Sequence, residues 1–302
     1  MKIAIIGTNG FLSTTIAKYA MEKGWTLDMY GLDKPTQHSY AQFYPIDLVS
    51  GNLDVDKLCD ADIIVYAVGA GIQSNLNESA DLIYALNVNA PVRICNALKQ
   101  TDYKGVFITF GSYFELGETI LNHPETEDDI INANAPAPTD YVVSKRMLTR
   151  FVSSYKHEFT HWHFILPTIY GVGENENRLI PYTIKSIIQG KALQFTSGKQ
   201  IRQYLHVSEV PALLWIAYQK GLPSGIYNIQ GPDVLSVKDV VTLIHEKMGK
   251  TIPNDCFGAI SRDDIDMQYL CLDGELLHKA LGYIPKLRLK DVIEEYIESY
   301  GK

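Results

Sequence analysis

A strand, a glycine turn and a helix at the start of the chain constrain its fold more than any other segment. Residues 2–6 form a short apolar run, Gly7-Thr8-Asn9-Gly10 makes a turn, and residues 11–23 carry helical spacing that stops at Gly24. Such a unit can bring backbone N–H groups against a pyrophosphate at the positive end of the helix. Taken alone, the turn indicates a plain helix entry about as well as a nucleotide site.

The rest of the chain continues this alternation of strands and helices. Apolar runs at residues 25–32, 42–46, 61–68, 105–110 and 162–166 predict strands, and residues 81–100 and 141–156 predict helices. Strands buried on both faces and joined by helices imply a Rossmann-type, doubly wound parallel sheet of the α/β class. Residues 120–139 combine prolines with acidic residues and are expected to form an exposed loop.

The regularity weakens after Pro167, which suggests a division into two domains. We expect a dinucleotide-binding domain over residues 1–166. A smaller substrate-binding domain is expected over residues 167–302, with some of its segments returning to the first domain. With 302 residues, 46% of them hydrophobic and 21% charged, the chain is long enough and apolar enough for both.

Charge and cysteine usage narrow the possible partners and the compartment. The net charge is −8 and no run of Lys or Arg is present, so nucleic acid is an unfavourable partner. No apolar segment is long enough to span a bilayer, and Gly7 interrupts the first apolar run too early for a signal peptide. The 4 cysteines are far apart, which predicts neither a zinc site nor a disulfide framework and fits a reducing cytoplasm.

Acidic residues follow the second and third predicted strands, where the adenosine half of a dinucleotide would lie. Asp33 ends the second strand and could accept hydrogen bonds from the ribose hydroxyls, which favours NAD. Lys34 could instead neutralise the 2′-phosphate of NADP, so the sequence leaves the choice open. Asp47, followed by Leu48, could approach the adenine amine, although an acidic residue at a strand end is more often a helix cap.

A tyrosine and a lysine four residues apart lie on one face of the helix predicted over residues 141–156. Tyr141 and Lys145 would place an ammonium near a phenol and make the phenol a usable acid or base near neutral pH. A surface pair at this spacing is also common by chance. Ser112 lies just after the strand at 105–110, at the carboxyl edge of the sheet, where open α/β folds bind ligands.

Two histidines on one face of a predicted strand are further candidates. His161 and His163 could ligate a metal, but no third ligand is evident. A structural role is the better interpretation, and we expect no metal site.

Several of these motifs occur in an order that resembles a known family. The order runs through the turn at Gly7, the acidic end of the second strand, Val68-Gly69-Ala70-Gly71, Ser112, Tyr141-x-x-x-Lys145 and Pro167-Thr168-Ile169-Tyr170-Gly171. It resembles that of the extended short-chain dehydrogenases/reductases that act on nucleotide sugars, the NAD-dependent epimerase/dehydratase family. Residues 177–181, 197–207 and 257–264 resemble the nucleotide-sugar binding segments of that family. Within it, the chain is most similar to 4-keto-deoxysugar reductases of the abequose or paratose synthase kind.

The resemblance implies roles for individual residues. Ser112, Tyr141 and Lys145 would be the catalytic residues, and Arg202 and Arg262 would hold the diphosphate of the sugar nucleotide. Tyr113, Arg178 and Leu179 would also contact the substrate, Arg178 being almost as well explained as a surface loop charge. The implied contacts to NAD(P)H come from the glycine turn and from five later segments: Gly7, Asn9, Gly10, Phe11, Leu12, Asp33, Lys34, Asp47, Leu48, Ala67, Val68, Gly69, Tyr141, Lys145, Pro167 and Thr168.

One departure from the family pattern bears on the reaction. The 4,6-dehydratases of the family follow the hydroxyl residue with an Asp-Glu pair, whereas this chain has Tyr113-Phe114, which argues against dehydration. The resemblance therefore implies NAD(P)H-dependent reduction of the 4-keto group of a nucleotide-linked deoxyhexose. A nucleotide-sugar 4-epimerase is the alternative, and a dinucleotide-binding regulator without turnover is a second one. The resemblance also implies a homodimer, formed by the helices at 81–100 and 141–156 as a four-helix bundle.

Overall fold

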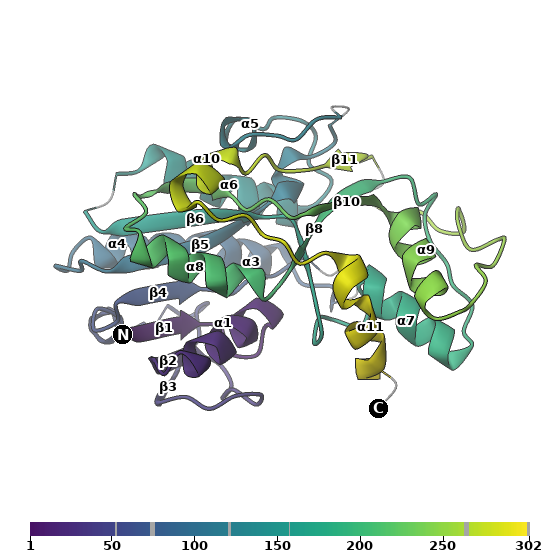
Figure 1. The fold of residues 1–302 in the computed structure, drawn as a ribbon. Coiled ribbons are helices and arrows are strands. Elements are labelled where there is room, and N and C mark those ends of the chain that lie inside the picture. Colours follow the sequence, from purple (N-terminus) through teal and green to yellow (C-terminus); the bar gives the residue numbers. More distant parts are fainter. Residues whose placement is uncertain (52, 73–75, 120–121, 157, 263–265, 301–302) are drawn as a thin grey trace.

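A seven-stranded parallel sheet forms the centre of the molecule in a computed structural model that describes residues 1–51, 53–72, 76–119, 122–156, 158–262 and 266–300. The order of its strands is β3-β2-β1-β4-β5-β6-β9 (Figure 1). The strands are β1 (Lys2–Ile6), β2 (Thr26–Gly31), β3 (Gln42–Pro45), β4 (Ile63–Tyr66), β5 (Val106–Ser112), β6 (Thr160–Leu166) and β9 (Gly225–Asn228). This order is the doubly wound Rossmann arrangement, so the predicted fold class is confirmed.

Helices cover both faces of this sheet. The α-helices of the described residues, including those at the C-terminal end, are α1 (Phe11–Glu22), α2 (Val55–Leu58), α3 (Ala80–Tyr84), α4 (Ala90–Leu98), α5 (Glu127–Ile131), α6 (Asp140–Ser154), α7 (Leu179–Gln189), α8 (Glu209–Gln219), α9 (Val237–Lys247), α10 (Glu275–Leu281) and α11 (Leu289–Tyr300). Ile3 and Ile5 pack with α1 and α8, whereas Ala4 and Ile6 pack with α4 on the opposite face. Alternate residues of β1 thus point to opposite layers, which is why the strand is apolar throughout.

The helix predicted over residues 81–100 consists of three pieces. A π-helical turn at Ala85–Asn89 joins α3 to α4, and Pro91 lies in the first turn of α4. Proline lacks a backbone N–H and is tolerated only near the start of a helix, so it favours a new helical segment at this point. The turn carries a buried asparagine, Asn87, into the interior.

A second, smaller sheet lies beside the large one and belongs to the C-terminal half. Its strands are β7 (Thr168–Tyr170), β8 (Ile201–His206), β10 (Asp233–Ser236) and β11 (Tyr269–Leu270), with β8 bonded to each of the others. Helices α7, α9 and α11 pack together at this end of the molecule, at the right of Figure 1. Strand β9 instead returns to the large sheet beside β6, so one segment beyond residue 166 belongs to the first layer system.

The structure corrects two local expectations. Within the segment predicted as an exposed loop, residues 120 and 121 lie outside the described residues. The segment also contains α5, which begins with a capping box between Thr126 and Asp129 and buries Ile130. Strand β5 extends two residues beyond the predicted end and includes Ser112. No helix in the described ranges has the length and apolar character needed to cross a bilayer.

Candidate active site

The glycine turn after β1 lies tightly against the end of β4. Gly7 has a φ of +105°, and its N–H donates to the Tyr30 carbonyl at 2.8 Å. A Cβ on Gly7 would lie 3.0 Å from Val68 Cγ2 and 3.1 Å from the Ala67 carbonyl oxygen. Both the backbone conformation and the close approach therefore require glycine. The turn, Ala67 and Val68 are brought together as predicted.

The N-terminus of α1 is suited to an anion. Gly10 is its N-cap residue, and no side chain of the described residues caps it, nor is there an acidic residue in its first turn. Phe11 and Leu12 are the first residues of this helix. Backbone N–H groups and the helix dipole at such an end favour a phosphate group. Ser13 is buried beneath the turn and donates from Oγ to the Gly10 carbonyl at 2.9 Å, which satisfies its hydroxyl.

Asn9 ties the turn to the segment after β2. Its Nδ2 donates to the Lys34 carbonyl at 3.2 Å, and its Oδ1 accepts from the Thr36 N–H at 3.1 Å. These bonds bring Asp33 and Lys34 beside the turn, with both side chains exposed. Either side chain can reach a ligand there, so the geometry leaves the choice between NAD and NADP open.

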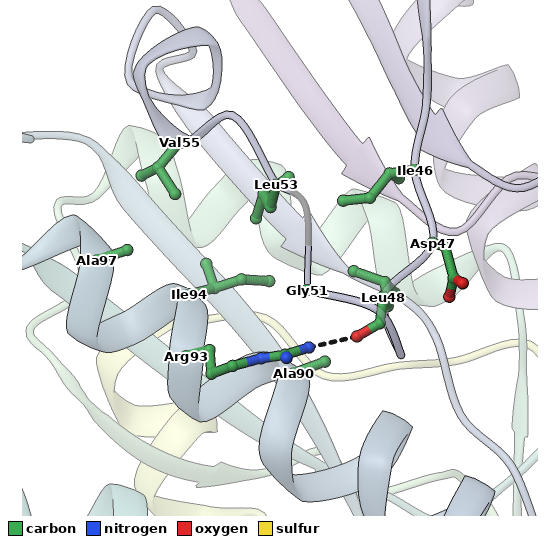
Figure 2. A pocket seen from close by; sticks show the side chains of 10 residues that line it. All are labelled: Ile46, Asp47, Leu48, Gly51, Leu53, Val55, Ala90, Arg93, Ile94 and Ala97. Carbon is green, nitrogen blue, oxygen red and sulfur yellow. Dashed lines mark hydrogen bonds between the residues drawn. The ribbon is translucent and has the colours of Figure 1, made fainter.

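Asp47 and Leu48 lie at the edge of a cavity of about 110 Å³ between the segment after β3 and α4 (Figure 2). Its other walls are largely apolar, and Leu53, Val55 and Ile94 contribute to them. The Arg93 guanidinium donates to the Leu48 carbonyl and holds this segment against α4. The Asp47 carboxylate points away from the cavity and accepts from the Val49 N–H at 2.9 Å. This bond closes a turn and does not cap a helix, because the next helix, α2, begins only at Val55; contact of Asp47 with a cofactor stays a prediction.

Asn87 joins the segment after β4 to α6, and the sequence analysis missed it. Its Oδ1 accepts from the Ala70 N–H, and its Nδ2 donates to the Ala70 carbonyl and to Ser144 Oγ, each at 2.9 Å. Ser144 precedes Lys145, so this buried amide positions the helix that carries Tyr141. Nearby, Gly69 is exposed, and a Cβ there would lie 3.6 Å from Asn87 Oδ1. Other polar residues, Asn89 among them, occupy the same stretch, so the sequence held no distinct signal for Asn87.

Ser112, Tyr141 and Lys145 meet at the carboxyl edge of β5. The Thr139 hydroxyl caps the start of α6 and places Tyr141 and Lys145 on its first turns. Lys145 Nζ donates to the Phe110 carbonyl at 2.9 Å and lies 5.8 Å from the centre of the Tyr141 ring. The Ser112 hydroxyl acts on the Tyr141 phenol through a hydrogen bond. The three side chains named from the sequence thus lie together in the fold.

The electrostatics of this group differ from the expectation. Burial raises the pKa of Tyr141, although the Ser112 hydroxyl and the charge of Arg178 act in the opposite direction. Burial also lowers the pKa of Lys145. The helical spacing of Tyr141 and Lys145 therefore does not by itself produce a phenol that titrates near neutral pH, because desolvation opposes the charged form of both groups.

The residues predicted to contact the substrate come from several distant segments. Pro167 lies between β6 and β7, and the hydroxyls of Tyr113 and Thr168 are hydrogen-bonded to each other. Arg202, on β8, is buried and donates to the Met267 carbonyl at 2.7 Å. Its guanidinium lies 5.9 Å from the centre of the Phe114 ring, which places it next to the segment after Ser112.

Two further arginines differ in their setting. Arg178 is the N-cap residue of α7, immediately before Leu179, and pairs through Nε with Glu174 Oε2 at 3.0 Å. Its charge acts on both Tyr113 and Tyr141, so it lies near the group around Ser112. Arg262 is exposed on the segment after Gly258, and its contact with a ligand stays a prediction. Asp263 and Asp264, at the end of the same motif, lie outside the described residues.

The two histidines of β6 have structural partners. His161 Nε2 and His163 Nδ1 both bond to Thr109 Oγ1, at 2.9 and 2.8 Å. Burial lowers the pKa of His163 to about 3, so its ring is neutral at physiological pH. Among the described residues, no group of three or more His, Cys, Asp or Glu side chains is arranged to hold a metal ion.

These features define a class of protein: an α/β chain of the Rossmann type with a glycine turn and a group of polar residues at the carboxyl edge of one sheet. The chain belongs to the NAD dependent epimerase/dehydratase family, whose model matches residues 3–229. The family predicted from the order of motifs is thereby confirmed.

Individual relatives are 21% to 30% identical to the chain over the aligned parts. A CDP-abequose synthase of Salmonella typhimurium is 27% identical over 168 residues, 52% of this chain and 55% of the relative. The dTDP-glucose 4,6-dehydratase 1 of Escherichia coli is 27% identical over 195 residues, 60% of this chain and 52% of the relative. The matches thus span about half the length of these relatives.

Solved structures reproduce the fold over the whole chain. The structure of MoeE5 in complex with UDP-glucuronic acid and NAD has a TM-score of 0.84 and 20% identity, and the match covers 100% of this chain and 99% of that one. At this identity the similarity establishes the fold, which that protein uses to bind NAD and a nucleotide sugar together.

Proposed function

We propose that the protein uses NAD(P)H to reduce the 4-keto group of a nucleotide-linked 6-deoxy or 3,6-dideoxy hexose. The observation that carries this proposal is the contact of the Tyr141 phenol with Ser112 beside Lys145, with Tyr113 and Phe114 following Ser112. Dehydration needs an acid and a base beside the hydroxyl residue. Tyr113 is buried and bonded to Thr168, and Phe114 has no ionisable group, so neither is suited to that task.

The residues at the cofactor side fit a dinucleotide. The uncapped N-terminus of α1 would hold the pyrophosphate, and the segment tied down by Asn9 would hold the adenosine ribose. The loop at Asp47 and Leu48 would lie along the adenine, and Pro167 and Thr168 would flank the nicotinamide end. When bound, NADH or NADPH supplies the hydride for reduction.

The chain's own residues then manage the proton and the charge. Tyr141 donates the phenol proton to the developing alkoxide at C4, and Ser112 donates a hydrogen bond to the same oxygen. The ammonium of Lys145 favours the phenolate left on Tyr141 and binds the nicotinamide ribose. Arg202 and Arg262 bind the diphosphate of the substrate, a task for which the planar guanidinium is suited, and Arg178 makes a polar contact to the same ligand.

A 4-epimerase is the second candidate, because the same residues could remove hydride and return it to the opposite face of the keto sugar. Tightly bound NAD that survives purification would favour epimerisation, whereas exchange with free reduced cofactor would favour reduction. A dinucleotide-binding regulator is the third candidate. It gains support if the protein binds cofactor and leaves every nucleotide sugar unchanged.

The proposal includes the setting in which the enzyme works. We propose a cytoplasmic homodimer whose contact is made by α3, α4 and α6, as the resemblance implies. Met147 on α6 is 47% exposed, and Tyr155, next to the end of this helix, is 37% exposed, so this face offers apolar surface to a second copy. The division into domains near residue 166 is part of the same proposal.

Loss of absorbance by reduced nicotinamide tests the function directly. The purified protein is mixed with NADH or NADPH and with CDP-, dTDP- and GDP-linked 4-keto-6-deoxy sugars in turn. Stoichiometric loss with one pair identifies the nucleotide and the cofactor together. No loss with any pair, in a protein that interconverts 4-hydroxy epimers, would replace the reductase by the epimerase.

A further inference from the structure

A line of buried polar side chains extends beneath Ser112 from β5 into α6 and β6. Thr149 Oγ1 bonds to His163 Nε2 at 2.9 Å, and the other nitrogen of the ring bonds to Thr109 Oγ1, which also bonds to His161. The end of this line nearest to Ser112 is Glu115, which is completely buried. Buried polar groups in such a line constrain one another, because each lost partner leaves another group unpaired.

Glu115 is bonded to the backbone of Ser112 itself. Its Oε1 accepts from the Ser112 N–H at 2.7 Å, while the Ser112 hydroxyl accepts from the Phe114 N–H at 3.3 Å. These bonds form a capping box around the short 3-10 helix at Tyr113–Leu116, directly after β5. The direction of the Ser112 side chain thus depends on the carboxyl of Glu115.

Gly111 leaves room for the Glu115 carboxyl, because it has no side chain. A Cβ on Gly111 would lie 2.5 Å from Glu115 Oε1 and 2.7 Å from His163 Nε2, closer than a real Cβ can approach. The second oxygen, Glu115 Oε2, is buried and has no hydrogen-bond partner among the described residues. Such a placement costs free energy unless nearby charge favours the carboxylate.

The charged groups that face Glu115 come mainly from α6. Lys145 and Arg146 act on its carboxyl with positive charge, and the Thr149 hydroxyl also favours the ionised form. Burial nevertheless raises the pKa of Glu115, and the neutral ring of His163 on β6 adds no charge. In return, the carboxylate acts to raise the pKa of both Lys145 and Tyr141.

The acidic groups of the other neighbouring elements are engaged elsewhere. On α5, Glu127 accepts from the Asn228 N–H, Asp129 caps Thr126, and Asp128 is exposed. On β11, Tyr269 interacts with Cys271. The carboxyl of Glu115 is therefore the negative group that acts most directly on Lys145 from this side.

We propose that Glu115 is a positioning residue for the site: its carboxyl fixes Ser112 through the backbone amide, and its negative charge balances the ammonium of Lys145. The inference rests on the proposed function, because it assigns Ser112 and Lys145 their roles in the reduction. Tyr113 and Phe114 carry no carboxyl, but the next residue, Glu115, supplies one that supports Ser112 and Lys145.

Two substitutions separate the two parts of this role. Glu115→Gln keeps an oxygen that can accept from the Ser112 N–H but removes the charge. The pKa of Lys145, which the carboxylate raises, then falls, so the limb of the kcat/KM profile lost at high pH with the ammonium moves down by about 1 pH unit. Glu115→Val removes the hydrogen bond as well, and kcat falls by a further ~10-fold at the optimum while the Kd for the cofactor stays unchanged.

The matched control is Glu118→Gln, which removes one negative charge from the same segment. Glu118 is half-buried, and its backbone N–H bonds to the Pro136 carbonyl. This variant should keep the limb of the wild-type profile in place. An unmoved limb in Glu115→Gln, or equal shifts in both variants, would overturn the proposal.

The pH dependence of unfolding tests Glu115 without any substrate. A carboxyl whose pKa is raised on folding from 4.5 to about 7 binds more protons in the folded chain between those values, so stability falls as pH rises through this range. Glu115→Gln lacks this loss. The unfolding free energy of the variant minus that of the wild type should therefore rise through this range, and an equal rise in Glu118→Gln would show that the proton is not taken up by Glu115 and would overturn the proposal.

Two further results keep the test decisive. If Glu115→Gln does not fold, Glu115→Asp replaces it: the shorter side chain keeps the charge but withdraws the carboxyl from the Ser112 N–H, so kcat falls while the high-pH limb stays in place, and an unchanged kcat overturns the proposal. If the difference in unfolding free energy between Glu115→Gln and the wild type rises as expected but no keto sugar is reduced, the proposed function is wrong, whereas the buried charge of Glu115 is supported. If Tyr141→Phe abolishes turnover but the limb never moves, the role of Glu115 fails and the function stands.

Discussion

The proposed cofactor side and the proposed substrate side of the site are built in different ways. The cofactor side uses residues close in sequence, such as Gly7, Asn9 and Gly10, held by backbone geometry at the ends of adjacent parallel strands. The substrate side gathers Arg178 and Arg202 from separate segments, each fixed by its own partner. The first side is encoded in short motifs, whereas the second depends on how the C-terminal half packs. Substitutions should therefore affect the two sides through different quantities.

The largest effect is expected where the two sides meet, at Tyr141. Tyr141→Phe removes the proton donor and should lower kcat by about 10³-fold, since a positioned acid contributes ~10² to 10⁴. Binding of reduced cofactor, followed by its fluorescence, should change little. Tyr155→Phe is the control, because this hydroxyl bonds to the exposed Asn96 at 3.3 Å. An active Tyr141→Phe enzyme would remove Tyr141 from the mechanism.

Gly7→Ala should break the cofactor side alone. A side chain at a φ of +105° that meets Val68 at 3.0 Å is strained, and the free energy of unfolding should fall by about 1–3 kcal/mol. Cofactor affinity should fall by at least ~10-fold because the turn has to move, which titration calorimetry measures. Gly24→Ala is the control: its φ is also positive, at +69°, but a Cβ there meets nothing within 4 Å. Equal losses of cofactor affinity in both variants would mean that the turn does not bind the dinucleotide.

Arg202→Lys should affect the substrate side alone. Lysine cannot reproduce the planar fork, so KM for the nucleotide sugar should rise by about 10-fold with little change in kcat. The Kd for the cofactor should stay the same. Arg150→Lys, on the exposed face of α6, serves as the control. A change confined to kcat would place Arg202 outside the diphosphate site.

The smallest effect is expected at the exposed pair beside the glycine turn. Asp33→Ala should weaken the binding of NADH by about 5-fold if the carboxylate binds the ribose hydroxyls. The affinity for NADPH should stay unchanged or increase. Lys34→Ala should weaken the binding of NADPH by a similar factor if the ammonium binds the 2′-phosphate. Competition between the two cofactors, measured in both variants, decides which of the two side chains sets the preference. If neither variant alters the ratio, neither side chain touches the adenosine ribose.

The sequence predicts what depends on local pattern. Apolar runs and the turn at Gly7 indicate the parallel sheet, because burial on both faces leaves few polar residues in each strand. Periodicity also placed Ser112 near the carboxyl edge of the sheet and Tyr141 at the start of a helix. That the two side chains meet was predicted only by the resemblance to the family, because spacing within one element says nothing about contacts between elements.

The rest depends on contacts between distant segments. Asn87 and Glu115 acquire their roles from Ser144 and Ser112 only after the strands and α6 have come together. The raised pKa of Tyr141 is likewise a result of burial, which the spacing of Tyr141 and Lys145 does not reveal. Helix α5 was missed for another reason: Thr126 and Asp129 have the spacing of a capping box, but the prolines and acidic residues of the segment suggested a loop.

The return of β9 to the large sheet has a consequence for how the chain reaches its native state. During synthesis β6 emerges well before β9, its neighbour at the edge of the sheet. The hydrogen bonds from Trp162 to the Leu222 carbonyl and from the His161 N–H to Ser224 can form only after residues 222–224 have been made. Until then β6 is a bare edge strand, open to pairing with another chain. A fragment that stops at residue 166 should therefore aggregate, whereas one that continues through Asn228 closes the sheet. The nascent chain is most vulnerable to misassociation in the interval between these two points.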